Sequence, residues 1–243
     1  PMFDKHYYSA PQFLLQRAAL VTAALLARAG LSKKIINFVS AGKLARYPLV
    51  WKSVESMGRL GAVVDAADGC RAVLILRHPC GYVASLVRGT KQGKFKDTES
   101  ASEDYGIFEE LLTTEAATER GLTMDYLKGL EPIERLAWFW VLFNEKALRD
   151  IDGKDNCHVV RYEDVCRNPL DESRRLLEFC DLAWDEQVET FVKTSTGRDN
   201  ASYYSVYKDP NEAANKWQSE LDEREIEQVM AIVRGTRPGE YYA

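Results

Sequence analysis

Several features that assign proteins to large functional classes are missing from this sequence. Its five cysteines form no CxxC pair and no metal-ligand pattern with the three histidines, so we expect reduced thiols and no bound metal. Acidic residues outnumber basic ones by 37 to 32, and the net charge of −5 argues against nucleic acid as a partner. The apolar stretch 18–27 is too short to cross a bilayer. Together these absences predict a cytoplasmic protein without a membrane span.

The length and the apolar content are sufficient for one large domain. With 243 residues, 46 % of them hydrophobic, the chain fits one large α/β domain or two small ones, and we expect a single domain over 1–243. It begins with Pro1 and shows no secretory signal pattern, so we expect further residues upstream.

The sequence is organised around residues 71–90. The apolar run 72–76 predicts a strand buried on both faces of a parallel sheet, and it ends at Arg77. His78 and Pro79 then interrupt the strand, and a helical apolar pattern follows. The carboxyl end of such a strand and the amino end of the next helix form a favourable place for an anion. From these residues alone, a surface cation at Arg77 is an equally good interpretation.

Further along the chain the same alternation of strand and helix recurs. A short strand is predicted at 48–51, ending in Lys52, and another at 156–161. A long amphipathic helix begins at Pro132, and the polar, acidic stretch 91–130 predicts an insertion that acts as a lid. The acidic pair in the turn after residue 161 is interpreted as structural, capping N–H groups and pairing with arginines.

Three segments resemble the sulfotransferases that use 3'-phosphoadenosine-5'-phosphosulfate (PAPS). Arg77-His78-Pro79 with Ser85 resembles their 3'-phosphate-binding segment, although the usual aspartate is His78 here. Residues 159–191, VVRYEDVCRNPLDESRRLLEFCDLAWDEQVETF, resemble their strand, Y-E-D turn and following helix. Lys216-Trp217 matches the pair that precedes their last helix.

The resemblance implies a fold and a set of site residues. The fold is α/β, a three-layer parallel sheet flanked by helices, of the P-loop nucleotide-hydrolase-like sulfotransferase type. Lys52 is the implied catalytic cation at the sulfuryl group. The implied cofactor-binding residues are Arg77, Ser85, Arg88, Ser202, Ser205 and Lys216.

One family feature is absent from the sequence. Sulfotransferases bind the 5'-phosphosulfate with a Ser/Thr- and Gly-rich loop after their first strand, and the nearest candidate, residues 40–43, lacks the upstream glycine of a Walker loop. The resemblance covers about residues 45–243. We therefore expect the loop and the general base ahead of Pro1.

The resemblance predicts transfer of a sulfuryl group from PAPS to a hydroxyl or amine, releasing adenosine 3',5'-bisphosphate (PAP), with no metal required. The acceptor, whether a small molecule, a carbohydrate or a peptide, is left open, as is the oligomeric state. Two alternatives stay open: an inactive module that binds 3'-phosphonucleotides, and a P-loop kinase of the same fold.

Overall fold

The computed structural model describes residues 48–54, 57–93, 101–196 and 209–243. The chain divides into two compact units, Pro1–Lys52 and Ser53–Ala243. All described helices and strands belong to the second unit. A single domain over the whole chain remains a prediction.

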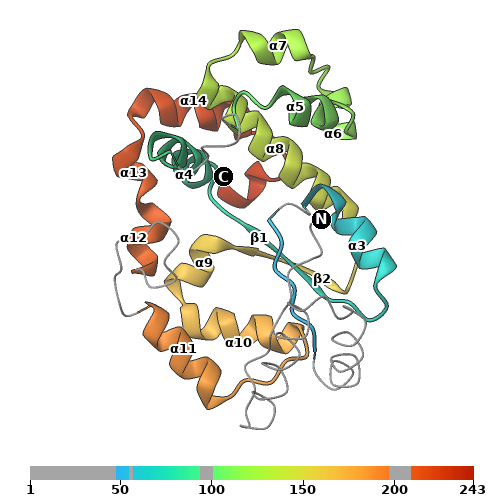
Figure 1. Cartoon of the computed structure of the whole chain (residues 1–243), viewed down its shortest axis with the longest axis vertical. Helices are drawn as coiled ribbons and strands as arrows, with labels where there is room; N and C mark the ends of the chain where they lie inside the picture. Colours follow the sequence, from blue (N-terminus) through green and yellow to red (C-terminus); the bar gives the residue numbers. More distant parts are fainter. Residues whose placement is uncertain (1–47, 55–56, 94–100, 197–208) are drawn as a thin grey trace, which may run out of the picture. The chain divides into compact units, whose positions relative to one another are not determined.

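Two parallel strands form the described sheet of the second unit (Figure 1). Strand β1 (Ala72–Leu76) pairs with β2 (Cys157–Arg161) so that the first residues of both strands lie opposite each other, as do the last. Both predicted strands and their parallel direction are confirmed. The carboxyl ends of β1 and β2 therefore lie side by side.

Burial of β1 on both faces was a wrong prediction. Leu74 and Leu76 are buried and pack against the last turns of α8 (Pro132–Asp150). Ile75 points to the opposite face and is 55 % exposed. The strand is apolar on both faces, but only one of them is fully covered by helices.

Helix α8 is the centre of the core. It begins at Pro132, as the sequence predicts, and the structure adds a capping box between Glu131 and Glu134. Trp138 and Trp140 are buried along it and belong to the core. The elements packed against it are η1 (Met57–Arg59), α3 (Leu60–Ala66), α4 (Pro79–Lys91) and α14 (Glu223–Val233).

Further helices lie on the other side of the sheet (Figure 1). His158 of β2 contacts the ring of Phe179, at a centroid distance of 5.2 Å, so α10 approaches the face opposite α8. Helices on both faces give the three layers expected of this α/β fold. The remaining elements of this side and of the tail are α9 (Tyr162–Arg167), α10 (Pro169–Phe179), α11 (Glu186–Thr196), α12 (Pro210–Asn215), α13 (Trp217–Glu220) and η2 (Gly239–Tyr242).

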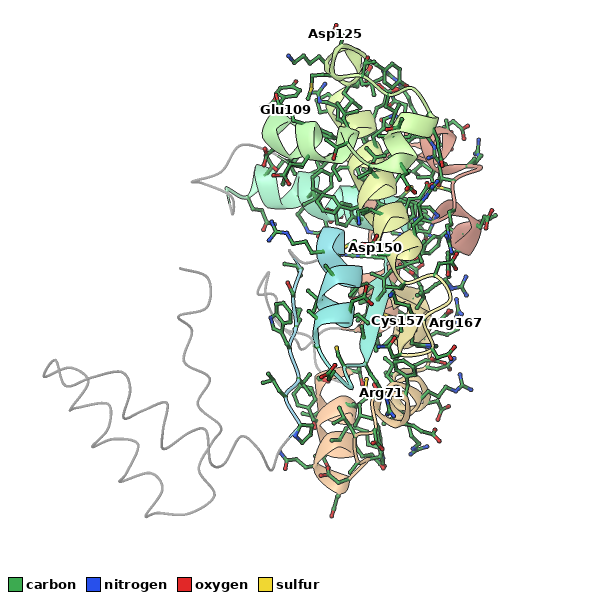
Figure 2. All side chains as sticks on the ribbon, turned by 90° about the vertical axis from the view of Figure 1, so that its right-hand side faces the viewer. Arg71, Glu109, Asp125, Asp150, Cys157 and Arg167 are labelled. Carbon is green, nitrogen blue, oxygen red and sulfur yellow. The ribbon has the colours of Figure 1, made fainter. Side chains whose placement is uncertain are left out.

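The described part of the predicted insertion is a packed layer of helices: α5 (Tyr105–Leu112), α6 (Glu115–Glu119) and α7 (Met124–Gly129). Phe108 and Leu127 are fully buried within the core that surrounds α8. Figure 2 shows Glu109 and Asp125 of this layer toward the opposite end of the unit from Arg71, which precedes β1. Its action as a lid remains a prediction.

The predicted strand at 48–51 is not formed. Residues 48–52 have no regular secondary structure, and Leu49 is 76 % exposed. An apolar segment becomes a strand only where a neighbouring strand pairs with it, and the described sheet contains β1 and β2 alone.

Among the described residues, none of the helices has the length and apolar content needed to cross a membrane.

Candidate phosphonucleotide site at the end of strand β1

Arg77 follows the last residue of β1, and the core fixes its backbone. The indole N–H of Trp140 donates to the Arg77 carbonyl oxygen at 3.0 Å. The guanidinium is half-buried: Nη2 donates to the Ala213 carbonyl at 3.3 Å, and Cζ lies 5.1 Å from the centre of the Tyr162 ring. Its Nε is buried and has no hydrogen-bond partner among the described residues. A buried N–H without a partner is unfavourable, so this group is suited to an incoming anion.

Gly81, in the first turn of α4, allows the predicted segment around Trp217 to pack close to Arg77. A Cβ atom at this position would lie 3.3 Å from both Arg77 Nε and Trp217 Cδ1. Only a glycine leaves room for these two groups without some movement. Arg77 and Trp217 are thus brought together at the first turn of α4.

His78 caps this helix in place of the family's usual aspartate. Its Nδ1 accepts from the Cys80 N–H at 3.2 Å, and its ring stacks on Trp217 at a centroid distance of 4.4 Å. The backbone N–H of His78 donates to Glu163 Oε1 at 2.9 Å, and the Tyr242 hydroxyl donates to Glu163 Oε2 at 3.1 Å. Burial lowers the pKa of His78 to about 4, so the cap is neutral near pH 7.

The acidic pair of the Y-E-D turn has the structural role predicted for it. Asp164 accepts from Arg161 at 2.7 and 2.9 Å and from Arg167 at 2.8 Å. These hydrogen bonds, chiefly that of Arg161, hold the pKa of Asp164 below its usual value. Glu163 satisfies a backbone N–H, that of His78, as a capping residue does.

Three other predicted cofactor ligands gather around one carboxylate. Arg88 Nη2 donates to Ser85 Oγ at 3.4 Å, and Arg88 Nη1 binds Glu220 Oε2. Lys216 Nζ lies 3.9 Å from Glu220 Oε1. Ser85 and Arg88 belong to α4, whereas Lys216 directly precedes α13 and Glu220 is its last residue. The structure therefore assembles Ser85, Arg88 and Lys216 from distant segments.

Glu220 is the member of this cluster that the sequence analysis missed. Its position four residues after Lys216 in a helical segment is a signal for an ion pair. No local pattern indicates its contact with Arg88, which depends on the packing of α13 against α4.

Three predicted site residues remain: Ser202, Ser205 and Lys52. Ser202 and Ser205 lie outside the described residues. Lys52 is exposed and belongs to the Pro1–Lys52 unit. It does not end a strand, which corrects the placement that suggested its catalytic role.

An open cavity of about 370 Å³ lies along β2, away from the residues of the predicted site that the structure describes. Of the proposed cofactor ligands, Arg77, Ser85, Arg88 and Lys216 do not line it. We place the candidate site at Arg77, because a buried cation and a helix amino end offer chemistry for an anion. The cavity is lined by His158, Val159, Val160, Arg161, Asp164, Asn168, Glu172, Arg175 and Tyr241.

Comparisons with known proteins agree with this fold. The mouse protein "Carbohydrate sulfotransferase 3" is 38 % identical over 61 residues, which cover 24 % of this chain and only 13 % of that protein. Its human counterpart is 36 % identical over 61 residues, again 24 % of this chain and 13 % of the relative. Among solved structures, "Sulfotransferase Domain from the Curacin Biosynthetic Pathway" is similar with a TM-score of 0.50, at 15 % identity, over 86 % of this chain and 72 % of that one.

The model of the "Sulfotransferase family" matches residues 3–186. The match begins well ahead of residue 45, where the resemblance in the sequence started, and ends before Lys216. Since it covers most of the sequence, the chain belongs to the sulfotransferase family.

Proposed function

We propose that this sulfotransferase moves a sulfuryl group from PAPS to the hydroxyl of a carbohydrate. The carbohydrate is suggested by the names of the relatives. The acceptor oxygen attacks sulfur, the bond from sulfur to the bridging phosphate oxygen breaks, and PAP leaves while a base takes the acceptor proton. No metal is needed in this scheme, because cationic side chains stabilise the leaving oxygen. The absence of paired cysteines supports a cytoplasmic location.

The observation that carries the proposal is the half-buried Arg77 at the end of β1. Its Nε has no protein partner among the described residues, and it lies beside the first turn of α4. A 3'-phosphate at this place would accept from the guanidinium. Ser85, Arg88 and Lys216 are proposed as further phosphate ligands, with Ser202 and Ser205 as additional candidates. Lys52 is proposed to stabilise charge at the sulfuryl group.

Binding of PAP and of AMP, measured by calorimetry, tests this assignment. We expect the protein to prefer PAP, because only PAP carries the 3'-phosphate. Arg77→Ala should remove the preference and weaken PAP binding by about 10- to 150-fold, since a hydrogen bond to a charged group contributes about 1.5–3 kcal/mol.

A matched arginine controls for the loss of positive charge. Arg71 lies at the other end of β1, where it binds the Phe179 carbonyl, so Arg71→Ala should leave the PAP affinity unchanged. Equal affinity of the unmodified protein for PAP and AMP would refute the 3'-phosphate site. PAP binding without turnover of PAPS would instead favour an inactive nucleotide-binding module.

A further inference from the structure

Glu220 is a negative charge among the side chains proposed to bind a phosphate. Its two carboxylate oxygens face two cations, Arg88 and Lys216, and Arg88 in turn contacts Ser85. A carboxylate at this place repels phosphate oxygens while it competes with them for the same cations. If Ser85, Arg88 and Lys216 bind phosphate, the Glu220 carboxylate has to move away from them.

The burial of the cluster makes this competition effective. The side chains of Arg88 and Glu220 are 23 % and 22 % exposed, so their interaction is less screened by solvent than a surface ion pair. Lys216 is 49 % exposed and is therefore accessible to a ligand from solvent. All three side chains can still change rotamer without disturbing the core, because none is fully buried.

The position of Glu220 allows it to move away. It is the last residue of the four-residue helix α13, directly before the buried Leu221. A rotamer change would carry the carboxylate away from Arg88 while Leu221 stays in the core. Arg88 and Lys216 would then face a phosphate dianion, whose two charges suit two cations better than one carboxylate does.

We infer that Glu220 is a placeholder for the phosphate. Its carboxylate holds Arg88 and Lys216 in the nucleotide-free protein and is displaced when the 3'-phosphate binds. This inference rests on the proposed function. Glu220 is thus a positioning residue that lowers the affinity for the nucleotide and holds the two cations near each other until the nucleotide arrives.

Glu220→Gln tests the inference by calorimetry with PAP and AMP. Because the competing charge is gone, the variant should bind PAP about threefold to tenfold more tightly than the unmodified protein. Its affinity for AMP, which has no 3'-phosphate, should be unchanged. Glu223→Gln is the matched control: it removes the same charge from the exposed first turn of α14 and should change neither affinity.

Thermal unfolding separates this role from a purely structural one. Without nucleotide, Glu220→Gln should melt below the unmodified protein, since Arg88 and Lys216 both lose their ionic contact with Glu220. With saturating PAP the difference should disappear, whereas a structural ion pair would lower both melting temperatures equally. Glu220→Asp keeps the charge and should restore the weaker PAP binding of the unmodified protein.

The outcomes distinguish the two proposals. If the unmodified protein prefers PAP over AMP but Glu220→Gln binds PAP no more tightly, the placeholder role is overturned and the proposed function stands. If the unmodified protein shows no preference for PAP, the proposed function and the placeholder role are both overturned.

Discussion

At the scale of single residues, His78 gives the site a neutral helix cap. Sulfotransferases usually carry an aspartate between the arginine and the proline of this turn. An aspartate would add a negative charge directly beside Arg77, whereas the imidazole caps the Cys80 N–H without one. Since burial keeps the pKa of His78 at about 4, this residue adds neither a negative nor a positive charge beside Arg77 near pH 7.

The depressed pKa of His78 predicts a loss of stability in acid. Between its ordinary pKa of 6.5 and the folded value of about 4, the unfolded chain binds a proton that the folded protein does not. Stability contributed by neutral His78 should therefore be complete above about pH 6.5 and fall by up to about 1.4 kcal/mol for each pH unit below it. Urea unfolding from pH 7 to pH 4.5 measures this.

His78→Asn is the control, because an asparagine oxygen can still cap the helix but does not titrate. The stability difference between the two proteins should change across this pH range in favour of the variant. Parallel curves would show that His78 does not titrate in this way.

The sequence could locate Arg77 but not its surroundings. The end of an apolar run and the spacing to Ser85 identified the residue. Its contacts with Tyr162 and Ala213 depend on how α9 and α12 pack, and these segments lie far along the chain. Glu220 was missed for the same reason, since Arg88 belongs to another helix.

At the scale of elements, periodicity predicted the segments with a strong pattern. The strands β1 and β2 and the helices α4, α8 and α10 form where apolar spacing, prolines and caps indicate them. The segment 48–51 failed because four apolar residues without a pairing strand do not determine a strand. The exposure of Ile75 shows a similar limit of sequence-based prediction, because the apolar character of a strand residue does not determine whether a helix will cover it.

The turn η2 connects the C-terminal end of the chain to the site, and Gly239 allows it to pack. A Cβ atom on Gly239 would overlap the Val233 carbonyl oxygen and lie 2.9 Å from Thr236 Oγ1. Gly239→Ala should therefore displace η2, which carries Tyr242 to Glu163, and lower the free energy of unfolding by about 1–3 kcal/mol.

Gly129→Ala is the matched control in chemical denaturation. No heavy atom lies within 4 Å of the Cβ position at Gly129, which is the last residue of α7. The stability of this variant should stay within about 1 kcal/mol of the unmodified protein, because alanine favours helix over glycine. Equal stability of the two alanine variants would contradict the tight packing of η2.

At the scale of the whole molecule, α8 links the core to the site. The same helix buries Trp140 and orients its indole N–H toward the carbonyl of Arg77. The strand and helix pattern of the sequence was sufficient for the fold class. For the layer α5–α7 the sequence contains only a weak helical pattern around Phe108, and it did not indicate that Phe108 packs into the core around α8.

The role of Lys52 is tested best in the full chain, because this residue and Arg77 belong to different compact units. If its charge stabilises the transition state more than the bound donor, Lys52→Ala should lower kcat by roughly 100-fold and change the PAP affinity little. Arg77→Ala should chiefly weaken nucleotide binding. Lys52→Arg keeps a positive charge and should retain more activity than Lys52→Ala. Steady-state kinetics with PAPS, together with PAP titration of each variant, separate the two effects.

Lys52 is exposed and ends no strand, so a solvated cation is the competing interpretation. A Lys52→Ala protein with near-normal kcat would establish that interpretation, and it would leave the assignment of Arg77 intact, since that rests on contacts within Ser53–Ala243.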